Sequence, residues 1–251
     1  FLIPAFLFTI TRRDNTRKAF IIQLSFPQSY RKIVSIVIIG VSLSFFYLTF
    51  SYWQGDTRFA SGYRLSRAGV YGKAQSLLSQ AIQKNYNEPL YHDELATVLA
   101  SLSIQALEAE EATQASVLAK QALEESDRAL QTSPRNVNFW KSRTKIFYAL
   151  SQFDPSFLNA AIQSLEQAQK LSPNDPKIFY NLAVLEGQLT QYDKAVDYLL
   201  TAKSLKPNYR DVYFALAVFY KEIKKPGLAK AVIEEYLTNV DPADKEFLLQ
   251  I

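Results

Sequence analysis

A spaced pattern of alanines and prolines recurs along most of the chain and limits its fold more than any other feature. In its full form, a second alanine follows the first after seven residues, and a proline follows five residues later. The full copies are Ala122, Ala129 and Pro134; Ala161, Ala168 and Pro173; and Ala195, Ala202 and Pro207. Incomplete copies begin at Ala74 and Ala229. Regular spacing of this kind predicts repeated copies of one structural unit.

The residue types in the pattern predict that each unit is a hairpin of two helices. Small side chains at one position per turn let two helices pack at the short end of the usual distance, about 8–10 Å between axes. Proline ends the second helix, because it has no N–H to donate and cannot continue the helix. The sequence therefore predicts an all-α fold in which successive hairpins stack.

The period of about 34 residues resembles that of the tetratricopeptide-repeat family. The matching positions are Trp140 in the third unit; Phe179, Leu182, Ala183, Tyr192, Ala195, Leu199, Ala202 and Pro207 in the fourth; and Tyr213, Leu216, Ala217, Tyr220 and Ala229 in the fifth. The resemblance implies a right-handed α-solenoid of about five hairpins over residues 55–243. The expected units are about 55–88, 89–135, 136–174, 176–209 and 210–243, and residues 244–251 are expected to begin a capping helix. Insertions are expected around 108–116 and 151–156.

Residues 33–53 form a run of 21 residues without a charge, IVSIVIIGVSLSFFYLTFSYW. As a helix this run is about 30 Å long, the thickness of the hydrocarbon core of a bilayer. Arg31 and Lys32 lie at one end, and Tyr52 and Trp53 lie at the other, where aromatic rings favour the membrane interface. We therefore expect a transmembrane helix that contacts the lipid bilayer through residues 33–53.

The N-terminal segment is expected to continue a membrane protein. Residues 1–11 are apolar but too short to span a bilayer, and the chain contains no Met. We interpret them as the second half of a truncated transmembrane helix, and the chain as a fragment of a longer protein.

The basic character of the chain, with a pI near 9.0, is concentrated in residues 12–32. This segment carries six Lys and Arg residues against Asp14 alone. Short basic loops between membrane spans usually lie in the cytoplasm. The sequence therefore predicts a cytoplasmic loop at 12–32, an extracytoplasmic repeat domain in a bacterial plasma membrane, and no nucleic-acid partner.

No catalytic, metal-binding or cofactor-binding pattern is present in the sequence. The chain has one histidine, His92, and no cysteine, whereas a metal site normally needs three or four convergent ligands. It has no Gly-rich phosphate loop and no nucleophile elbow. We expect His92 to be a surface or packing residue, and the chain itself to be no enzyme.

The family resemblance implies that the first helices of the hairpins line a concave ligand groove. The residues at the ligand-facing positions are Lys141, Ser142, Lys145, Tyr148, Lys177, Tyr180, Asn181, Val184, Gln188, Asp211, Phe214, Val218, Lys221 and Glu222. Their mixture of aromatic, amide and charged groups suits an extended peptide or protein segment, or a glycan. The Lys/Asn/Arg clamp that some family members use for peptide carboxylates is not reproduced, since Asp211 and Ala215 occupy key places.

Two functions remain open from the sequence. The first is a membrane-anchored interaction module at the end of a larger membrane protein. The arrangement of spans and repeats, with YHDELA, NVNFWKSRTKIFYALSQFDP and KPNYRDVYFALAVFY, resembles the C-terminal tail of bacterial O-antigen ligase/polymerase-type membrane glycosyltransferases. That resemblance implies a parent enzyme that moves lipid-linked glycans. The alternative is a scaffold or assembly factor of a secretion or pilus system with no enzymatic parent.

Overall fold

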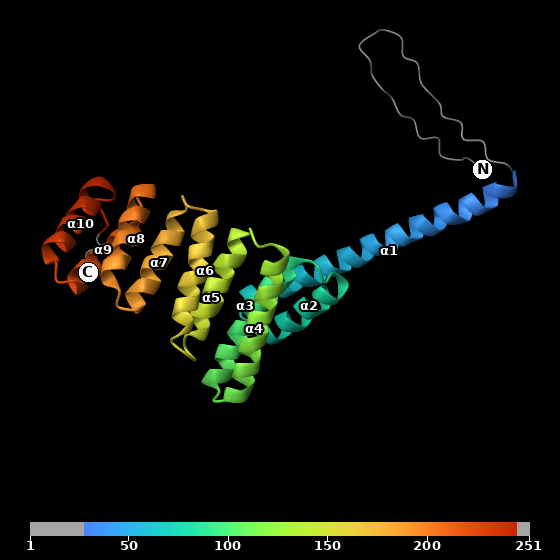
Figure 1. Ribbon diagram of the computed structural model, residues 1–251, viewed down its shortest axis with the longest axis horizontal. Coiled ribbons are helices and arrows are strands. Elements are labelled where there is room, and N and C mark those ends of the chain that lie inside the picture. Colours follow the sequence, from blue (N-terminus) through green and yellow to red (C-terminus); the bar gives the residue numbers. More distant parts are fainter. Residues whose placement is uncertain (1–27, 245–251) are drawn as a thin grey trace, which may run out of the picture. The chain divides into compact units, whose positions relative to one another are not determined.

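The computed structural model describes residues 28–244, and every regular element in this range is an α-helix (Figure 1). The chain divides into two compact units, one ending at Ser51 and the other beginning at Tyr52. The helices are α1 (Gln28–Arg67), α2 (Tyr71–Lys84), α3 (Pro89–Glu108), α4 (Ala112–Thr132), α5 (Val137–Leu150), α6 (Phe157–Leu171), α7 (Pro176–Gln188), α8 (Tyr192–Leu205), α9 (Arg210–Glu222) and α10 (Pro226–Asn239). The all-α prediction is confirmed for this part of the chain.

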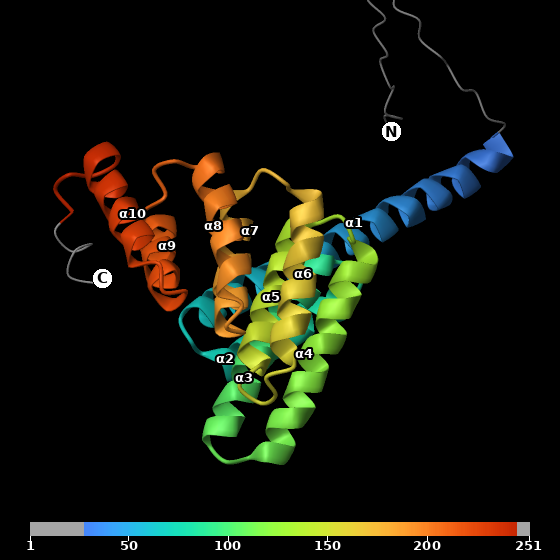
Figure 2. The same ribbon diagram turned by 60° about the vertical axis from the view of Figure 1, so that its left-hand side comes forward.

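Helices α3 to α10 form four helical hairpins that stack in chain order. Each hairpin packs a first helix against a second one, and the first helices α3, α5, α7 and α9 follow one another along the stack (Figures 1 and 2). Three core clusters continue from one hairpin into the next. Because each hairpin covers the apolar face of its neighbour, the core is continuous along the stack.

The alanines of the repeated pattern are buried between the packed helices. Their side chains are between 0% and 1% exposed: Ala74, Ala81, Ala122, Ala129, Ala161, Ala168, Ala195, Ala202 and Ala229. A larger side chain at these positions would overlap the facing helix. The spacing in the sequence therefore identified the helix contacts correctly.

The turns between helices follow from local sequence. Asp175 precedes α7 and accepts a hydrogen bond from the backbone N–H of Lys177 at 3.0 Å, while Pro176 occupies the first turn of the helix. Asn136 caps α5 in the same way. Four turns contain a residue with positive φ: Gly69 between α1 and α2, Glu110 between α3 and α4, Thr190 between α7 and α8, and Lys224 between α9 and α10. Three of these are not glycine, so they hold a backbone conformation that ordinary side chains disfavour.

The two expected insertions have different structures. In the α3–α4 hairpin, both helices are long, with 20 and 21 residues, and residues 109–111 form the tip. In the α5–α6 hairpin, the extra residues form the connection at 151–156. The first insertion extends the helices, because its alanines and glutamates are good helix formers.

Helix α1 differs from the predicted boundaries. It begins at Gln28, inside the loop expected at 12–32, and continues past Trp53 to Arg67, into the first repeat unit expected at 55–88. No proline interrupts this stretch. Gly62 lies within the helix at a point where α2 packs closely against it and leaves no room for a larger side chain. A Cβ on Gly62 would lie 2.9 Å from Cγ of Leu78.

Several predictions fall outside the described residues. They are the truncated transmembrane helix at 1–11, residues 12–27 of the basic loop, and residues 245–251 of the capping helix.

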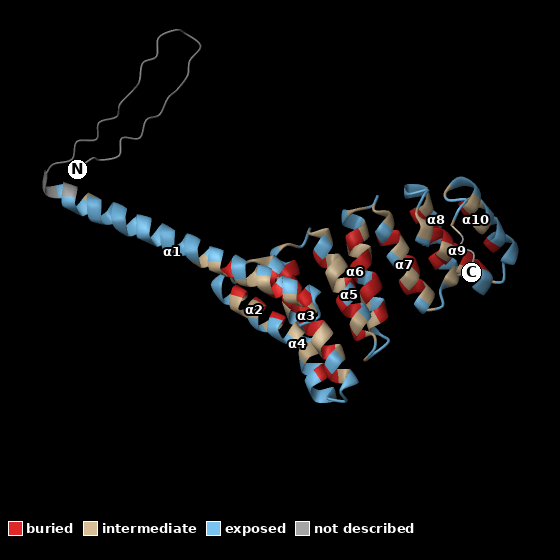
Figure 3. Ribbon diagram, turned by 180° about the vertical axis from the view of Figure 1, so that it is seen from behind, coloured by how far each residue is buried: buried red, intermediate tan, exposed pale blue. Residues whose placement is uncertain are grey.

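The apolar segment of α1 is exposed along its length. Ile36 is 70% exposed and Phe45 is 73% exposed, and Figure 3 shows this stretch in the colour of exposed residues. Among the described residues, one helical stretch, Lys32–Arg67, is long and apolar enough to cross a membrane by length and composition.

Candidate ligand-binding groove

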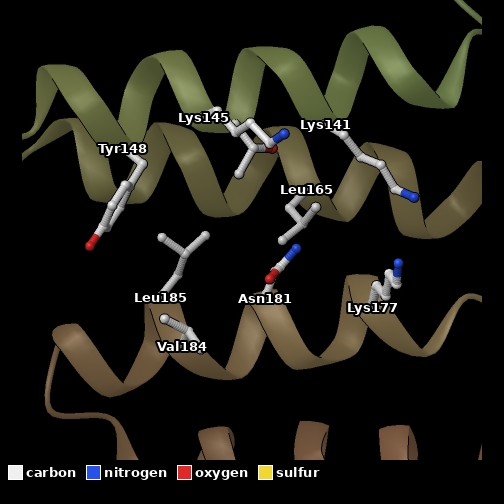
Figure 4. A pocket seen from close by; sticks show the side chains of 9 residues that line it. Lys141, Lys145, Tyr148, Leu165, Lys177, Asn181, Val184 and Leu185 are labelled. Atoms are coloured by element: carbon white, nitrogen blue, oxygen red, sulfur yellow. The ribbon is translucent and has the colours of Figure 1, made fainter. Parts of the chain in front are cut away.

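A hollow of about 390 Å³ lies between the first helices α5 and α7, with α6 beneath it. Figure 4 shows Lys141, Lys145 and Tyr148 extending from α5 toward Asn181 and Val184 on α7. The residues that line the hollow are Lys141, Thr144, Lys145, Tyr148, Leu165, Lys177, Asn181, Val184 and Leu185.

Helix periodicity brings these side chains to one face. Lys141, Lys145 and Tyr148 are separated by four and three residues, and so are Lys177, Asn181 and Val184 on the facing helix. Leu165 and Leu185 form an apolar floor, since they are only 1% and 4% exposed. The hollow therefore has an apolar base and a polar, basic rim.

The rim carries more positive than negative charge. Nζ of Lys141 lies 2.5 Å from Oδ2 of Asp175, so this lysine is neutralised. Burial alone would raise the pKa of Asp175, but the hydrogen bonds from Lys141 and from the Lys177 N–H outweigh burial and lower it. Within residues 28–244, the structure gives Lys145 and Lys177 no ion pair within 4.0 Å. These two ammonium groups can meet an anionic ligand.

A second hollow of about 320 Å³ adjoins the first at Val184 and lies between α7 and α9. It is lined by Val184, Gly187, Gln188, Tyr192, Val218, Phe219 and Glu222. Gly187 lies directly against the ring of Phe219, and any Cβ at this position would clash with that ring. Where the two hollows meet, Nε2 of Gln188 donates a hydrogen bond of 3.1 Å to the hydroxyl of Tyr148.

Nine of the fourteen residues expected to face a ligand line one of these two hollows: Lys141, Lys145, Tyr148, Lys177, Asn181, Val184, Gln188, Val218 and Glu222. The structure places the other five elsewhere. Ser142 donates a hydrogen bond to Asp93, the ring of Tyr180 packs 5.4 Å from that of Tyr209, and Phe214 packs against the core. Asp211 and Lys221 are exposed outside the hollows.

Sequence reasoning missed the apolar and small residues of the groove. Leu165 comes from a second helix, although only first helices were expected to contribute. Leu185 and Phe219 were indistinguishable from core residues in the sequence. The glycine at position 187, inside a helical pattern, was the available signal of a close approach.

A cluster of buried polar residues lies in the first turns of helix α3 and contacts three neighbouring helices. The hydroxyl of Tyr91 donates a hydrogen bond to Asp56 of α1. Oε1 of Glu94 accepts one from Ser66, also of α1, at 2.7 Å. Between them, His92 and Asp93 contact α4 and α5, as described below. These contacts connect the end of α1 to the stacked hairpins.

His92 is held as a cation in this cluster. Its Nδ1 lies 2.5 Å from Oε2 of Glu125 in α4, and its Nε2 lies 2.7 Å from the carbonyl oxygen of Tyr86. A carboxylate and a carbonyl oxygen both accept hydrogen bonds, so this arrangement favours a ring that is protonated on both nitrogens. Burial alone would lower the pKa of His92, but the hydrogen bonds to Glu125 and to the Tyr86 carbonyl outweigh burial and raise it. The expectation of a packing histidine therefore holds, with a buried ion pair in addition.

Asp93 is the least compensated group of the cluster. It is 8% exposed, and its Oδ2 accepts a hydrogen bond of 3.0 Å from Ser142, whereas its Oδ1 is buried without a hydrogen-bond partner within residues 28–244. Burial raises the pKa of Asp93 to about 7, and the negative charge of Glu94 adds to this, despite the Ser142 hydrogen bond and the positive charge of Lys145. A change in pH near neutrality therefore changes the charge beside Lys145.

Comparison with known proteins supports the repeat assignment. A family model described as tetratricopeptide repeat matches residues 176–209. The BBSome complex member BBS4 of Bos taurus is 36% identical over 76 residues, which are 30% of this chain and 15% of that protein. The Hsp70-Hsp90 organising protein of Plasmodium falciparum (isolate 3D7) is 33% identical over 97 residues, which are 36% of this chain and 16% of that protein. The chain thus spans less than a fifth of the length of these curated relatives.

The fold is similar to that of solved repeat structures. The pilF protein of Pseudomonas aeruginosa superposes with a TM-score of 0.58 at 19% sequence identity, covering 80% of this chain and 82% of that chain. At this identity the similarity concerns the fold alone. Residues 176–209 thus match the tetratricopeptide-repeat model, and within residues 28–244 a long apolar helix is followed along the chain by an all-α stack of hairpins whose fold is similar to that solved structure.

Proposed function

We propose that the chain is a membrane-anchored interaction module that binds an extended segment of a protein partner in the hollow between α5 and α7. The observation that carries the proposal is the pairing of an apolar floor with two lysines, Lys145 and Lys177, that have no ion pair within residues 28–244. The ligand that fits is a peptide with a carboxylate next to an apolar side chain. Both tetratricopeptide repeats and the relatives named above are compatible with protein partners.

The chemistry of the hollow favours this ligand. An apolar side chain of the ligand that packs on Leu165 and Leu185 is removed from contact with water. This burial stabilises binding by about 25 cal/mol for each Å² of apolar surface. The lysines at the rim add charge complementarity, which improves selectivity and the rate of association more than it raises affinity. Because both ammonium groups are exposed, we expect each to contribute about 1 kcal/mol or less.

Binding of a short acidic peptide tests the proposal. The full chain, held in detergent micelles, is titrated into a fluorescein-labelled peptide of alternating Glu and Leu, and anisotropy is measured at low and high salt. We expect Lys145→Gln and Lys177→Gln each to weaken binding by about threefold to fivefold at low salt, and the effect to shrink at high salt. Lys120→Gln is the matched control, since this lysine is 80% exposed on α4 and lines neither hollow. Equal binding by the wild-type chain and both groove variants would contradict the proposal.

The membrane anchor is the second part of the proposal. Residues 33–53 span the bacterial plasma membrane, and the repeats lie on its extracytoplasmic side. The exposed apolar surface of this stretch and the positive charge at 12–32 support this arrangement. The chain has no Cys, so Asn174→Cys, in the exposed turn before α7, provides a single reporter. Labelling of intact cells by a membrane-impermeant maleimide is the expected result, and labelling only after lysis would place the repeats in the cytoplasm.

The parent protein is the third part. The sequence of the repeats resembles the C-terminal tail of an O-antigen ligase/polymerase-type membrane glycosyltransferase. In such a parent protein the groove would bind a glycan or a partner subunit. The competing assignment is a scaffold or assembly factor of a secretion or pilus system. A neutral oligosaccharide that displaces the labelled peptide would favour the glycan enzyme, whereas displacement by acidic peptides alone would favour the scaffold.

A further inference from the structure

The two hollows form one groove whose charge changes sign along its length. Both hollows are lined by Val184. Lys177 lies near the start of α7, and Lys145 lies further along the first hollow, opposite Asn181 (Figure 4). The charged residue that lines the other hollow is Glu222, at the end of α9. The groove is therefore basic at one end and acidic at the other.

The acidic end is built in the same way as the basic end. Glu222 is exposed, and no ion pair within 4.0 Å is found for it within residues 28–244. Val218 and the rings of Tyr192 and Phe219 provide an apolar wall beside its carboxylate. A basic side chain with an apolar stem would fit this end, because the stem can pack on the wall while the charge reaches Glu222.

The part of α7 that lines both hollows gives a length scale for the ligand. Lys177 and Gln188 lie eleven residues apart on α7, so the helix rises by about 16 Å between them. An extended peptide advances about 3.3 Å per residue. The part of α7 that lines the two hollows is therefore as long as about five residues of an extended peptide.

We infer that the groove selects an extended peptide segment that carries one acidic and one basic side chain, with an apolar side chain between them. The acidic side chain meets Lys145 and Lys177, the apolar side chain lies near Val184, and the basic side chain meets Glu222. A second acidic group in place of the basic one would face Glu222, and repulsion between like charges would weaken binding. This inference rests on the proposed function, since it names the ligand of the same groove.

Two labelled peptides with a central leucine test the inference. The mixed peptide has a glutamate and a lysine five positions apart, and the acidic peptide has glutamates at both places. Each is made in both chain directions, and the tighter direction is used. We expect the wild-type chain in detergent micelles to bind the mixed peptide at least fivefold more tightly than the acidic one. We expect Glu222→Lys to reverse this preference and Glu222→Gln to abolish it.

A matched control is available on α10. Glu234 is 65% exposed and lines neither hollow, so Glu234→Lys makes the same charge change and should retain the wild-type preference. Unchanged helix content and melting temperature show that each variant is folded. If Glu222→Lys keeps the wild-type preference while Lys145→Gln and Lys177→Gln weaken binding, the inference is overturned and the proposed function stands. If neither peptide binds the wild-type chain, both are overturned.

Discussion

Replacing Asp93 by asparagine should stabilise the protein at alkaline pH, although it removes a charged group from a polar cluster. Asp93 is 8% exposed, and one of its two carboxylate oxygens has no hydrogen-bond partner within residues 28–244. A buried carboxylate of this kind is stable as a neutral acid and costly as an anion. Asparagine keeps an acceptor for the hydrogen bond from Ser142 and is never charged.

The magnitude follows from the pKa of Asp93. Burial raises it from 3.8 to about 7 in the folded chain. Because the folded state binds this proton more tightly than the unfolded state does, the contribution of Asp93 to stability is greatest below pH 3.8. It falls as the pH rises from 3.8 toward 7. Each pKa unit corresponds to about 1.36 kcal/mol. Relative to low pH, the raised pKa of Asp93 therefore lowers stability by roughly 2 kcal/mol at pH 5, where the carboxyl ionises only in the unfolded chain, and by roughly 4 kcal/mol at pH 8.

The asparagine variant has a cost of its own. Its amide N–H groups take the place of the unpartnered oxygen, and a buried donor without an acceptor costs about 1–3 kcal/mol. The net expectation for Asp93→Asn is a stabilisation of about 2 kcal/mol at pH 8 and almost no change at pH 5. The difference between the two pH values does not depend on the uncertain hydrogen-bond cost.

Urea unfolding followed by far-ultraviolet circular dichroism measures this difference. Wild-type and Asp93→Asn chains are compared in detergent micelles at pH 5 and pH 8. Titration of His92 affects both chains equally, so it cancels in the comparison. If the free energy of unfolding differs between the two chains by the same amount at both pH values, Asp93 is not a strained, titrating group and the reasoning fails.

Three further substitutions test the packing, the turns and the buried ion pair. Ala202→Leu should lower the free energy of unfolding by about 1–3 kcal/mol, because Ala202 is 0% exposed, whereas Ser204→Leu on the exposed side of α8 should change it by less than about 0.5 kcal/mol; equal thermal stability of the two variants would contradict the assigned repeat register. Thr190→Gly should raise the melting temperature, since Thr190 has φ of 58° and glycine removes about 1 kcal/mol of backbone strain; a lower melting temperature would show that the threonine side chain stabilises the turn. Because the folded pKa of His92 is raised above 6.5, its ion pair with Glu125 stabilises the fold below pH 6.5, and this contribution is lost as the pH rises through the folded pKa. Glu125→Gln should therefore destabilise by roughly 3 kcal/mol at pH 6 and by less at pH 9 in urea unfolding, and a loss independent of pH would argue against a charged His92.

The sequence predicted the stacked hairpins well because repeated alanines and prolines act locally. An alanine at Ala195 or Ala202 reports a close helix contact, and Pro207 reports the end of a helix, whatever the rest of the chain does. Nine of the fourteen expected groove residues line the hollows for the same reason, since a fixed period places them on one face of each first helix.

The remaining features depend on contacts between residues far apart in the sequence. The burial of His92 and Asp93 follows from their partners Glu125 and Ser142, and no spacing along the chain identifies these pairs. The continuation of α1 past Trp53 was hidden because the change in composition there resembles a boundary. Tyr180 was expected in the groove and instead packs on Tyr209, a contact that crosses from one hairpin to the next.

If the face formed by α5 and α7 holds the partner, a bound peptide must lie against these two helices. A peptide of Glu and Leu with a photoreactive side chain next to the glutamate is cross-linked to the full chain in detergent micelles, and the linked residues are identified by mass spectrometry. We expect cross-links within 141–148 of α5 and 177–184 of α7. These cross-links should disappear when unlabelled peptide is in excess. Competed cross-links confined to α4 and α10, which line neither hollow, would contradict it.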